Sequence, residues 1–222
     1  MSAPKPGSQA EAFFNTVAEW CDSAERPIDI APFLTGSGVE IRRYLDLGAG
    51  TGQTIENVLA RVRRESILAV DVSSKMLDLL RAKHPAVETT QRDIVEYVRE
   101  DGSSFDLITA IGVPEFVSNF DLGLVISGAA KALNPGGPFA FTYEPIVASV
   151  RTQRKRVETS LGWVGSPLTW YRRNPGPVRL ALKRFGFKIL FEIHVPQAYK
   201  NEDKLPVAWE FVVAARSAVS GS

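Results

Sequence analysis

Short apolar segments alternate along this chain with segments in which apolar residues recur every three or four positions. The apolar segments have the length of buried strands, and five of them lie at Tyr44–Leu47, Ile67–Val72, Val87–Thr90, Phe105–Ile111 and Phe139–Tyr143. Helical spacing occurs between them, at Thr54–Val62, Ser73–His84 and Leu122–Leu133. This order predicts a mainly parallel sheet whose right-handed crossovers put helices on both faces.

The last third of the chain follows a different order. A short helix is predicted at Val178–Phe185, and two strands follow it, at Phe187–Val195 and Trp209–Ala215, with no helix between them. Strands joined by so short a connection pair antiparallel. The predicted fold is therefore a doubly wound α/β fold: a mostly parallel seven-stranded sheet with one antiparallel strand near the edge and helices on both faces.

The length of 222 residues suits one compact domain with a full hydrophobic core. We expect residues 1–34 to form a disordered lead and then helices that act as a lid. Residues 35–222 are expected to form the domain itself. Within it, residues 144–174 interrupt the alternation and are predicted to be an insert on the substrate side.

Composition is that of a soluble globular protein, with 45% apolar residues, 23% charged residues and a formal net charge of +1. A net charge so close to zero does not indicate a protein that binds nucleic acid through overall positive charge. No apolar run reaches the ~20 residues that span a bilayer, and the N-terminus lacks the pattern of a secretory signal. The single cysteine, Cys21, favours a reducing compartment. We expect a cytoplasmic monomer or homodimer with no membrane or nucleic-acid partner.

The turn after the first strand carries the strongest chemical signal. Its sequence is Leu45-Asp46-Leu47-Gly48-Ala49-Gly50-Thr51-Gly52, and it opens the first helix of the sheet. Glycines permit a tight turn and let a ligand approach the backbone, while the helix start offers free N–H groups. Asp71 ends the next strand, where a carboxylate can accept both hydroxyls of a ribose. This combination predicts a nucleoside site.

Two common nucleotide motifs do not fit this turn. A dinucleotide fingerprint that starts at Gly48 requires glycine where Gln53 stands, and one that starts at Gly50 requires glycine where Ile55 stands. The lysine-containing ending of a P-loop is also missing from the sequence.

The spacing Asp46-x-Gly48-x-Gly50-x-Gly52 resembles the first motif of the class I methyltransferases, which use S-adenosylmethionine (SAM). The resemblance extends from about Arg43 to Arg216. It implies that SAM is the cofactor and S-adenosylhomocysteine (SAH) the product, with Asp71 on the ribose, Met76 on the adenine and Asp93 on the adenine amino group. The implied cofactor-binding residues are Asp46, Gly48, Ala49, Gly50, Thr51, Gly52, Asp71, Val72, Met76, Asp93, Ile94, Ile111, Gly112 and Val113.

Three of these assignments have structural alternatives. Met76 lies on an amphipathic helix and can be an ordinary core residue. Asp46 can cap the turn that follows it, and Asp93 can be a helix N-cap. Asp71 has the clearest functional interpretation, because a carboxylate that ends an apolar strand has no packing reason to be there.

Methyl transfer from a sulfonium needs alignment of the acceptor and exclusion of water, and a base only where a proton must leave. Three titratable residues lie near the carboxyl ends of predicted strands and are candidate catalytic residues: Glu144, Glu115 and His194. Each has an ordinary alternative, as a solvated or capping carboxylate or as a plain strand residue. No metal site is predicted.

Two aromatic segments are expected to form the substrate chamber. One is the helical segment Ala12–Leu34, and the other is the insert that contains Trp163. The candidate substrate residues are Phe14, Trp20, Tyr143, Trp170 and Tyr171. Their aromatic content favours an apolar or planar acceptor, although the same side chains can merely anchor the insert to the core.

The sequence therefore favours a SAM-dependent methyltransferase that acts on oxygen or nitrogen, less readily carbon, of a small molecule such as a specialised metabolite. Other functions remain open. One is a SAM-binding enzyme that catalyses a rearrangement or decarboxylation, and another is a non-catalytic partner subunit. A third is an RNA methyltransferase that uses the basic run Arg151–Arg156.

Overall fold

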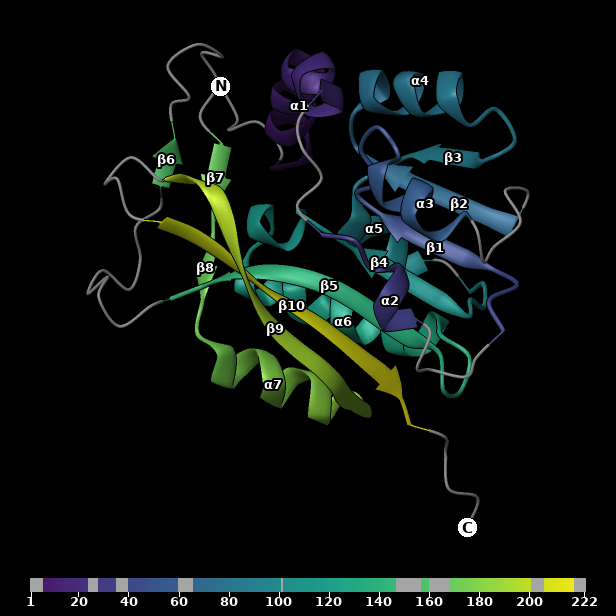
Figure 1. Cartoon of the computed structure of the whole chain (residues 1–222), viewed down its shortest axis with the longest axis vertical. Coiled ribbons are helices and arrows are strands. Elements are labelled where there is room, and N and C mark those ends of the chain that lie inside the picture. The colour runs from purple at the N-terminus through teal and green to yellow at the C-terminus, as the bar shows by residue number, and fades with distance from the viewer. Residues whose placement is uncertain are drawn as a thin grey trace.

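The computed structural model describes residues 6–23, 28–34, 40–59, 66–100, 102–146, 157–159, 168–200 and 206–217. Its main sheet has the strand order β3-β2-β1-β4-β5-β10-β9, with β8 added beside β5 (Figure 1). The strands are β1 (Tyr44–Leu47), β2 (Ile67–Asp71), β3 (Glu88–Gln91), β4 (Leu107–Ala110), β5 (Pro138–Pro145), β8 (Arg172–Arg173), β9 (Phe187–Lys200) and β10 (Pro206–Arg216).

The pairing confirms the predicted fold class. Strands β1 to β5 pair in parallel, whereas β10 lies antiparallel to both β5 and β9. The last two strands are longer than predicted. A hairpin of β6 (Val157–Thr159) and β7 (Leu168–Trp170), together with β8, lies in the region predicted as an insert. Neither the hairpin nor β8 is predicted from the sequence. Strand β8 has only two residues, and its partner β5 is distant along the chain.

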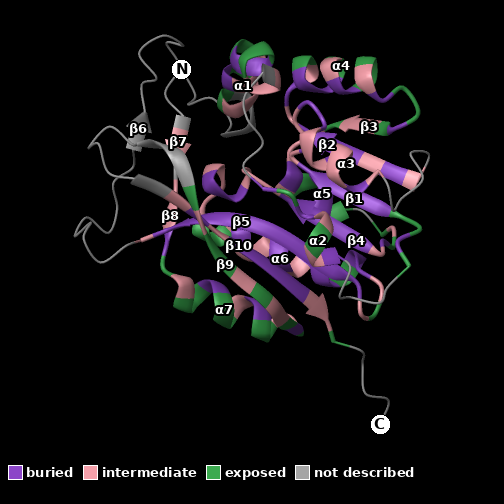
Figure 2. Cartoon of the chain, viewed as in Figure 1, coloured by how far each residue is buried: buried purple, intermediate pink, exposed green. Residues whose placement is uncertain are grey.

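Helices cover both faces of the sheet, as predicted. One face packs against α5 (Ile94–Glu100), α6 (Asn119–Ala132) and α7 (Pro175–Arg184) through a buried cluster that contains Phe139, Phe141 and Tyr143. The other face packs against α2 (Ala31–Leu34), α3 (Gln53–Val58) and α4 (Ser74–Lys83), with Tyr44 and Phe211 in its cluster. Figure 2 shows the central strands buried between these two layers.

The N-terminal helix α1 (Pro6–Ser23) lies beside α4, away from the centre of the sheet (Figure 1). It begins earlier than the helical segment predicted from residue 12. Phe13, Val17 and Ala18 of α1 form a separate buried cluster with Met76 of α4. Among the helices that the structure describes, none has the length and apolar content needed to cross a bilayer.

The contact between α5 and α6 leaves no room for a side chain at Gly128. A methyl group built there would lie 2.5 Å from Cβ of Val98 and 2.8 Å from its carbonyl oxygen. In the same helix, a methyl group at Gly123 meets nothing within 4 Å. The two positions therefore form a matched pair, because they share one helix and differ in the space around them.

We predict that Gly128→Ala lowers the free energy of unfolding by about 1–3 kcal/mol, since α5 and α6 must separate to admit the methyl group. Gly123→Ala should raise it by about 0.5–1 kcal/mol through helix propensity alone. Urea unfolding followed by circular dichroism measures both. Equal effects of the two substitutions would contradict the packing of α6 described here.

Candidate functional site

The glycine turn lies at the carboxyl end of β1 and is fixed to the neighbouring strand. The N–H groups of Gly48 and Ala49 both donate to the carbonyl of Val70, at 2.7 and 3.1 Å. Gly48, Gly50 and Gly52 have φ angles of +71°, +53° and +89°, which side chains disfavour. The turn therefore depends on glycine for its conformation, and β2 holds it in place.

The loop glycines differ in what surrounds them. A methyl group built on Gly48 would lie 2.1 Å from Cγ2 of Val113, in the segment after β4. On Gly50 it would meet only Sδ of Met76, at 4.0 Å. Gly48 thus lets the loop after β4 pack on the turn, whereas Gly50 borders open space beside Met76, as a backbone that receives a ligand requires.

Asp71 joins the turn to the end of β2. Its Oδ2 accepts from the N–H of Gly50 at 2.9 Å, and its Oδ1 accepts from the N–H of Ser73 at 2.8 Å. Burial raises the pKa of Asp71, while these backbone bonds oppose the rise. Each carboxylate oxygen can accept a further hydrogen bond, so the arrangement leaves capacity for two ribose hydroxyls.

Asp46 lies deeper, on β1, and is 1% exposed. Its Oδ1 accepts from the hydroxyl of Thr109 at 2.6 Å, and that hydroxyl lies 2.8 Å from the hydroxyl of Tyr44. Its Oδ2 is buried and has no hydrogen-bond partner among the described residues. Burial raises the pKa of Asp46 to about 7.

The residues implied for the adenine lie on α4 and at the start of α5. Met76 packs against α1, and Ile94 is buried in the cluster of the opposite layer. Oδ1 of Asp93 accepts from the N–H groups of Val95 and Glu96, at 2.8 and 3.2 Å. The N-cap role weighed for Asp93 is therefore present, and its role toward an adenine stays a prediction.

Helix α1 is attached to the candidate site by polar contacts as well as by packing. Oδ1 of Asn15 accepts from Oγ of Ser73 at 2.7 Å and from the N–H of Lys75 at 3.2 Å, at the N-terminus of α4. The ring of Phe14 packs edge-on against Phe116, with centroids 5.0 Å apart. Of the predicted substrate residues on α1, Phe14 thus lies beside the loop after β4, whereas Trp20 is 59% exposed.

Beyond the glycine turn, four charged side chains gather near the ends of β4 and β5. Glu115 belongs to the short helix η3 (Pro114–Phe116) and is completely buried; neither of its carboxylate oxygens has a hydrogen-bond partner within the described part of the chain. Arg173 is 2% exposed and donates to the carbonyls of Val117, Ser118 and Tyr171. Arg172 forms an ion pair with Glu144 at 2.6 Å.

Burial dominates the electrostatics of this cluster. It raises the pKa of Glu115 to about 7, against the opposing influence of Arg173 and Thr142. It also lowers the pKa of Arg173 to about 10. With Glu115 protonated, the cluster made of Glu115, Glu144, Arg172 and Arg173 carries one net positive charge, which suits an anionic ligand.

Sequence reasoning missed several residues of this region. Oγ1 of Thr142 accepts from the N–H of Gly112 at 2.8 Å, and a methyl group on Gly112 would lie 3.5 Å from the ring of Trp209. Nε1 of Trp209 is buried without a partner among the residues that the structure places. Thr109 and Thr142 gave a usable signal, since each is a polar residue inside an apolar strand. Arg173 and Trp209 gave none.

Two predicted residues face away from the site. Tyr143 lies opposite Glu210, and Glu210 lies opposite His194, so these side chains share the face that α7 covers. The hydroxyl of Tyr143 donates to Glu192 at 3.2 Å, and Nδ1 of His194 lies 3.0 Å from Glu210. Because side chains alternate along a strand, Thr142 and Glu144 take the opposite face, the one shared with Asp46.

Tyr171 lies near the charged cluster, and its N–H donates to the carbonyl of Glu115 at 2.7 Å. The side chains of Trp163 and Trp170 and the run Arg151–Arg156 lie outside the described residues. In the described part of the chain, no three His, Cys, Asp or Glu side chains converge as a metal site.

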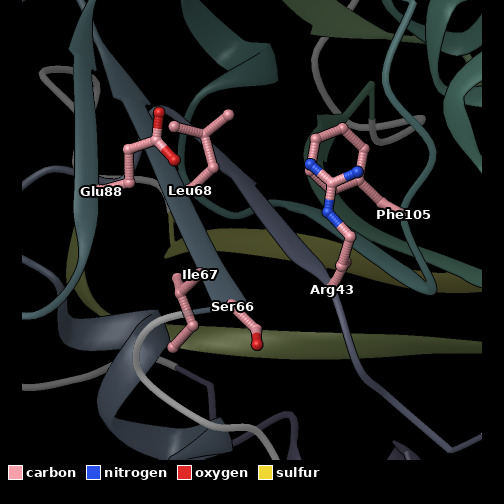
Figure 3. Close-up of a pocket in the computed structure, with 6 residues that line it drawn as sticks. All are labelled: Arg43, Ser66, Ile67, Leu68, Glu88 and Phe105. Atoms are coloured by element: carbon pink, nitrogen blue, oxygen red, sulfur yellow. The ribbon is translucent and has the colours of Figure 1, made fainter.

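A small pocket lies at the opposite end of the parallel strands from the glycine turn, near the amino ends of β1 and β2 (Figure 3). It is lined by Arg43, Ser66, Ile67, Leu68, Glu88 and Phe105. The guanidinium of Arg43 lies 4.9 Å above the centre of the Phe105 ring. Ligands of open α/β sheets bind at the carboxyl ends of the strands, so this pocket is not the candidate site.

Comparison with known proteins gives the following likenesses. Residues 45–139 match the family described as "Methyltransferase domain". The chain is 31% identical over 96 residues to trans-aconitate 2-methyltransferase of Paracidovorax citrulli, covering 43% of this chain and 36% of the relative. It is 38% identical over 79 residues to malonyl-[acyl-carrier protein] O-methyltransferase of Halalkalibacterium halodurans, covering 33% and 29%. The chain thus spans half or less of the length of these curated relatives.

The structural likeness is more extensive than the sequence likeness. Magnesium protoporphyrin IX methyltransferase from Synechocystis PCC 6803, solved with bound SAM, superposes with a TM-score of 0.70 at 15% identity. The match covers 98% of this chain and 100% of that one. At this identity, the likeness establishes a shared fold.

We predict that Glu115→Gln stabilises the protein, relative to the original chain, more at high pH than at low pH. Because the folded pKa of Glu115 is raised from 4.5 to about 7, the unfolded chain loses this proton at lower pH than the folded chain does. The resulting cost to the fold therefore grows as pH rises towards 7 and is constant above that. Between pH 5 and pH 9, the unfolding free energy of the variant should gain about 1–3 kcal/mol relative to the original chain. Chemical unfolding at each pH measures this difference.

The exposed Glu88→Gln controls for the change in net charge. If that substitution gave the same trend with pH, burial of Glu115 would not be its cause.

Proposed function

We propose that this chain, which carries a class I, Rossmann-like methyltransferase domain, transfers a methyl group from SAM to a small molecule. The observation that carries the proposal is the glycine turn itself. Gly50 borders open space, and the carboxylate of Asp71 is bound to the N–H of the same residue at 2.9 Å. The match of residues 45–139 to a methyltransferase domain and the fold shared with a SAM-bound enzyme support it.

Three of the residues present are compatible with SAM. Asp71 has acceptor capacity for the ribose, and the buried Oδ2 of Asp46 lacks a partner among the described residues. Met76 lies beside the open space at Gly50, where an adenine ring requires an apolar contact. When bound, the cofactor supplies an activated methyl group on a positively charged sulfur.

The chain's own residues then have three tasks: to orient the acceptor, to exclude water and to hold a proton where one is released. Helix α1 and the contact of Phe14 with Phe116 serve to cover the site. Glu115 and Glu144 remain the candidate proton-holding residues, because both are buried at the ends of β4 and β5. His194 faces the other layer and is the weaker candidate.

An oxygen atom of an acid is the acceptor that this site favours. The charged cluster at Glu115, Glu144, Arg172 and Arg173 gains a net positive charge when Glu115 is protonated, and an acid supplies the matching negative charge. Two of the similar proteins are named for the methylation of acids, trans-aconitate and a malonyl group. A carboxylate needs no base before it accepts a methyl group, so Glu115 can keep its proton.

We predict that Asp71→Ala weakens the binding of SAH about ten- to a hundredfold, which is the usual effect of deleting a buried hydrogen-bond partner. Titration calorimetry with SAH measures the affinity. Asp78→Ala is the matched control, because Asp78 is an exposed acid on α4 that pairs with Arg81 on the same helix. Unchanged affinity in a folded Asp71→Ala protein would remove Asp71 from the ribose site.

The reaction itself is tested with SAM that carries an isotopic label on its methyl group. We expect label to enter small carboxylic acids such as trans-aconitate, and mild base to release it as methanol, because esters hydrolyse and ethers or methylamines do not. Label that withstands base would place the methyl group on another atom. An acceptor changed without uptake of label would indicate a rearrangement or decarboxylation instead.

A further inference from the structure

Two buried polar groups, near the end of β4 and the start of β10, have no hydrogen-bond partner among the described residues. One is the indole N–H of Trp209 on β10, a residue that is 8% exposed. The other is the carboxyl group of Glu115, which is 0% exposed and has neither oxygen bonded. Burying a polar group without a partner is unfavourable, so a native structure that keeps two of them close together indicates a ligand for both.

The two groups border one region around Gly112. A methyl group built on Gly112 would lie 3.5 Å from Cη2 of Trp209, and Nε1 lies along the same edge of that indole ring. The N–H of Gly112 donates to Oγ1 of Thr142 at 2.8 Å, and Thr142 in turn acts on the carboxyl group of Glu115. Because Gly112 belongs to the segment implied for the cofactor, this region adjoins the cofactor end of the proposed site.

The register of the sheet puts Trp209 on the face of the candidate site. Glu210 lies opposite Tyr143, so the preceding residue, Trp209, lies beside Glu144. Since side chains alternate along a strand, Trp209 shares the face of Thr142 and Glu144 and not the face that α7 covers. Its ring belongs to the buried cluster beneath α2, α3 and α4, which agrees with this assignment.

The nearby arginines are already engaged. Arg172 forms its ion pair with Glu144 on the face of the site. Arg173 is the next residue of β8, so it points to the other face, where it donates to three backbone carbonyls. No hydrogen bond joins Arg173 to Glu115. A fully buried carboxyl group without a bonded counter-ion keeps its proton, so Glu115 offers an O–H group beside the N–H of Trp209.

We propose that Nε1 of Trp209 and the O–H group of Glu115 bind one carboxylate of the methyl acceptor and thereby select small carboxylic acids. This inference rests on the proposed function and names the residues that recognise its acceptor. Hydrogen bonds to a charged oxygen are the strong ones, and both donors are shielded from water. The nearby charge of Arg173 also favours an anion.

These bonds also orient the acceptor. The carboxylate oxygen that receives them is held, and the other oxygen keeps its lone pairs for the methyl group. A C–O bond forms as the methyl–sulfur bond breaks, and the electron pair of the broken bond stays on sulfur. No proton leaves the acceptor, so the proton of Glu115 remains in place throughout.

The N–H signal of Trp209 in a nuclear magnetic resonance spectrum tests the contact directly. Protein labelled with nitrogen-15 gives an indole signal for each of its four tryptophans, and the signal missing from Trp209→Phe belongs to Trp209. With SAH already bound, trans-aconitate or malonate should move this signal to lower field, because a hydrogen bond to a carboxylate deshields the proton. The fully methylated esters of both acids are the ligand controls and should leave it in place, since they carry no charge.

Variants measure what each donor contributes. Trp209→Phe keeps an aromatic ring without the N–H, and we expect it to weaken binding of the acid to the SAH complex about tenfold, with unchanged affinity for SAH. The KM for the acid should rise by the same factor. Glu115→Leu should weaken acid binding to a similar extent, and it carries the test if Trp209→Phe fails to fold. Tyr97→Phe, which removes a polar atom from an aromatic ring in the opposite layer, is the control and should change neither affinity.

The outcomes separate this inference from the proposed function. A Trp209 signal that moves with SAH alone, and no further with either acid, would assign the indole to the cofactor and overturn the inference. A signal that neither SAH nor the acids move would also overturn it, while the proposed function stands if SAH binds and label from SAM enters a product. Absence of SAH binding to the original chain would overturn both.

Discussion

The candidate site depends on the carbonyl of Val70, which accepts hydrogen bonds from the N–H groups of both Gly48 and Ala49. These bonds set the turn after β1 against β2, and the carboxylate of Asp71 completes the link through the N–H of Gly50. The loop after β4 then packs on Gly48 through Val113. The glycine turn after β1 thus contacts both the end of β2 and the loop after β4. These contacts hold the turn in the conformation that leaves space beside Gly50.

Two buried acids on either side of that point divide the candidate site by chemistry. Asp46 lies beneath the turn with one oxygen bonded to Thr109, and Glu115 lies beyond Gly112 among two arginines and a second glutamate. Burial raises both pKa values to about 7, yet their surroundings differ. Asp46 has no cation near it in the described structure, whereas Glu115 lies near Arg173. A buried carboxyl group without a neighbouring cation, such as Asp46, suits a cationic ligand. The cluster of Glu115 with its two arginines suits an anionic ligand.

The sequence predicted the sheet and the position of the glycine turn well, because both depend on local signals. Glycine spacing after a strand, the acid at Asp71 and the alternation of strands and helices are visible within short windows of sequence. The sequence does not show which side chains of β5 point to which face of the sheet. Pro138–Pro145 is buried on both faces, so apolar and polar residues do not alternate along it. Tyr143 and His194 were therefore grouped with the site, although the register turns them toward α7. Arg173 stands in a polar stretch, and only its distant partners Val117 and Ser118 explain its burial.

Helix α1 lies outside the segment that resembles a methyltransferase domain, yet Asn15 bonds to the start of α4 and Phe13 packs on Met76. A shortened chain that began near residue 40 would keep every strand and the whole glycine turn. It would also strip the covering from Met76 and leave an apolar surface open to water. Domain boundaries drawn from family likeness alone would thus leave out one wall of the candidate site.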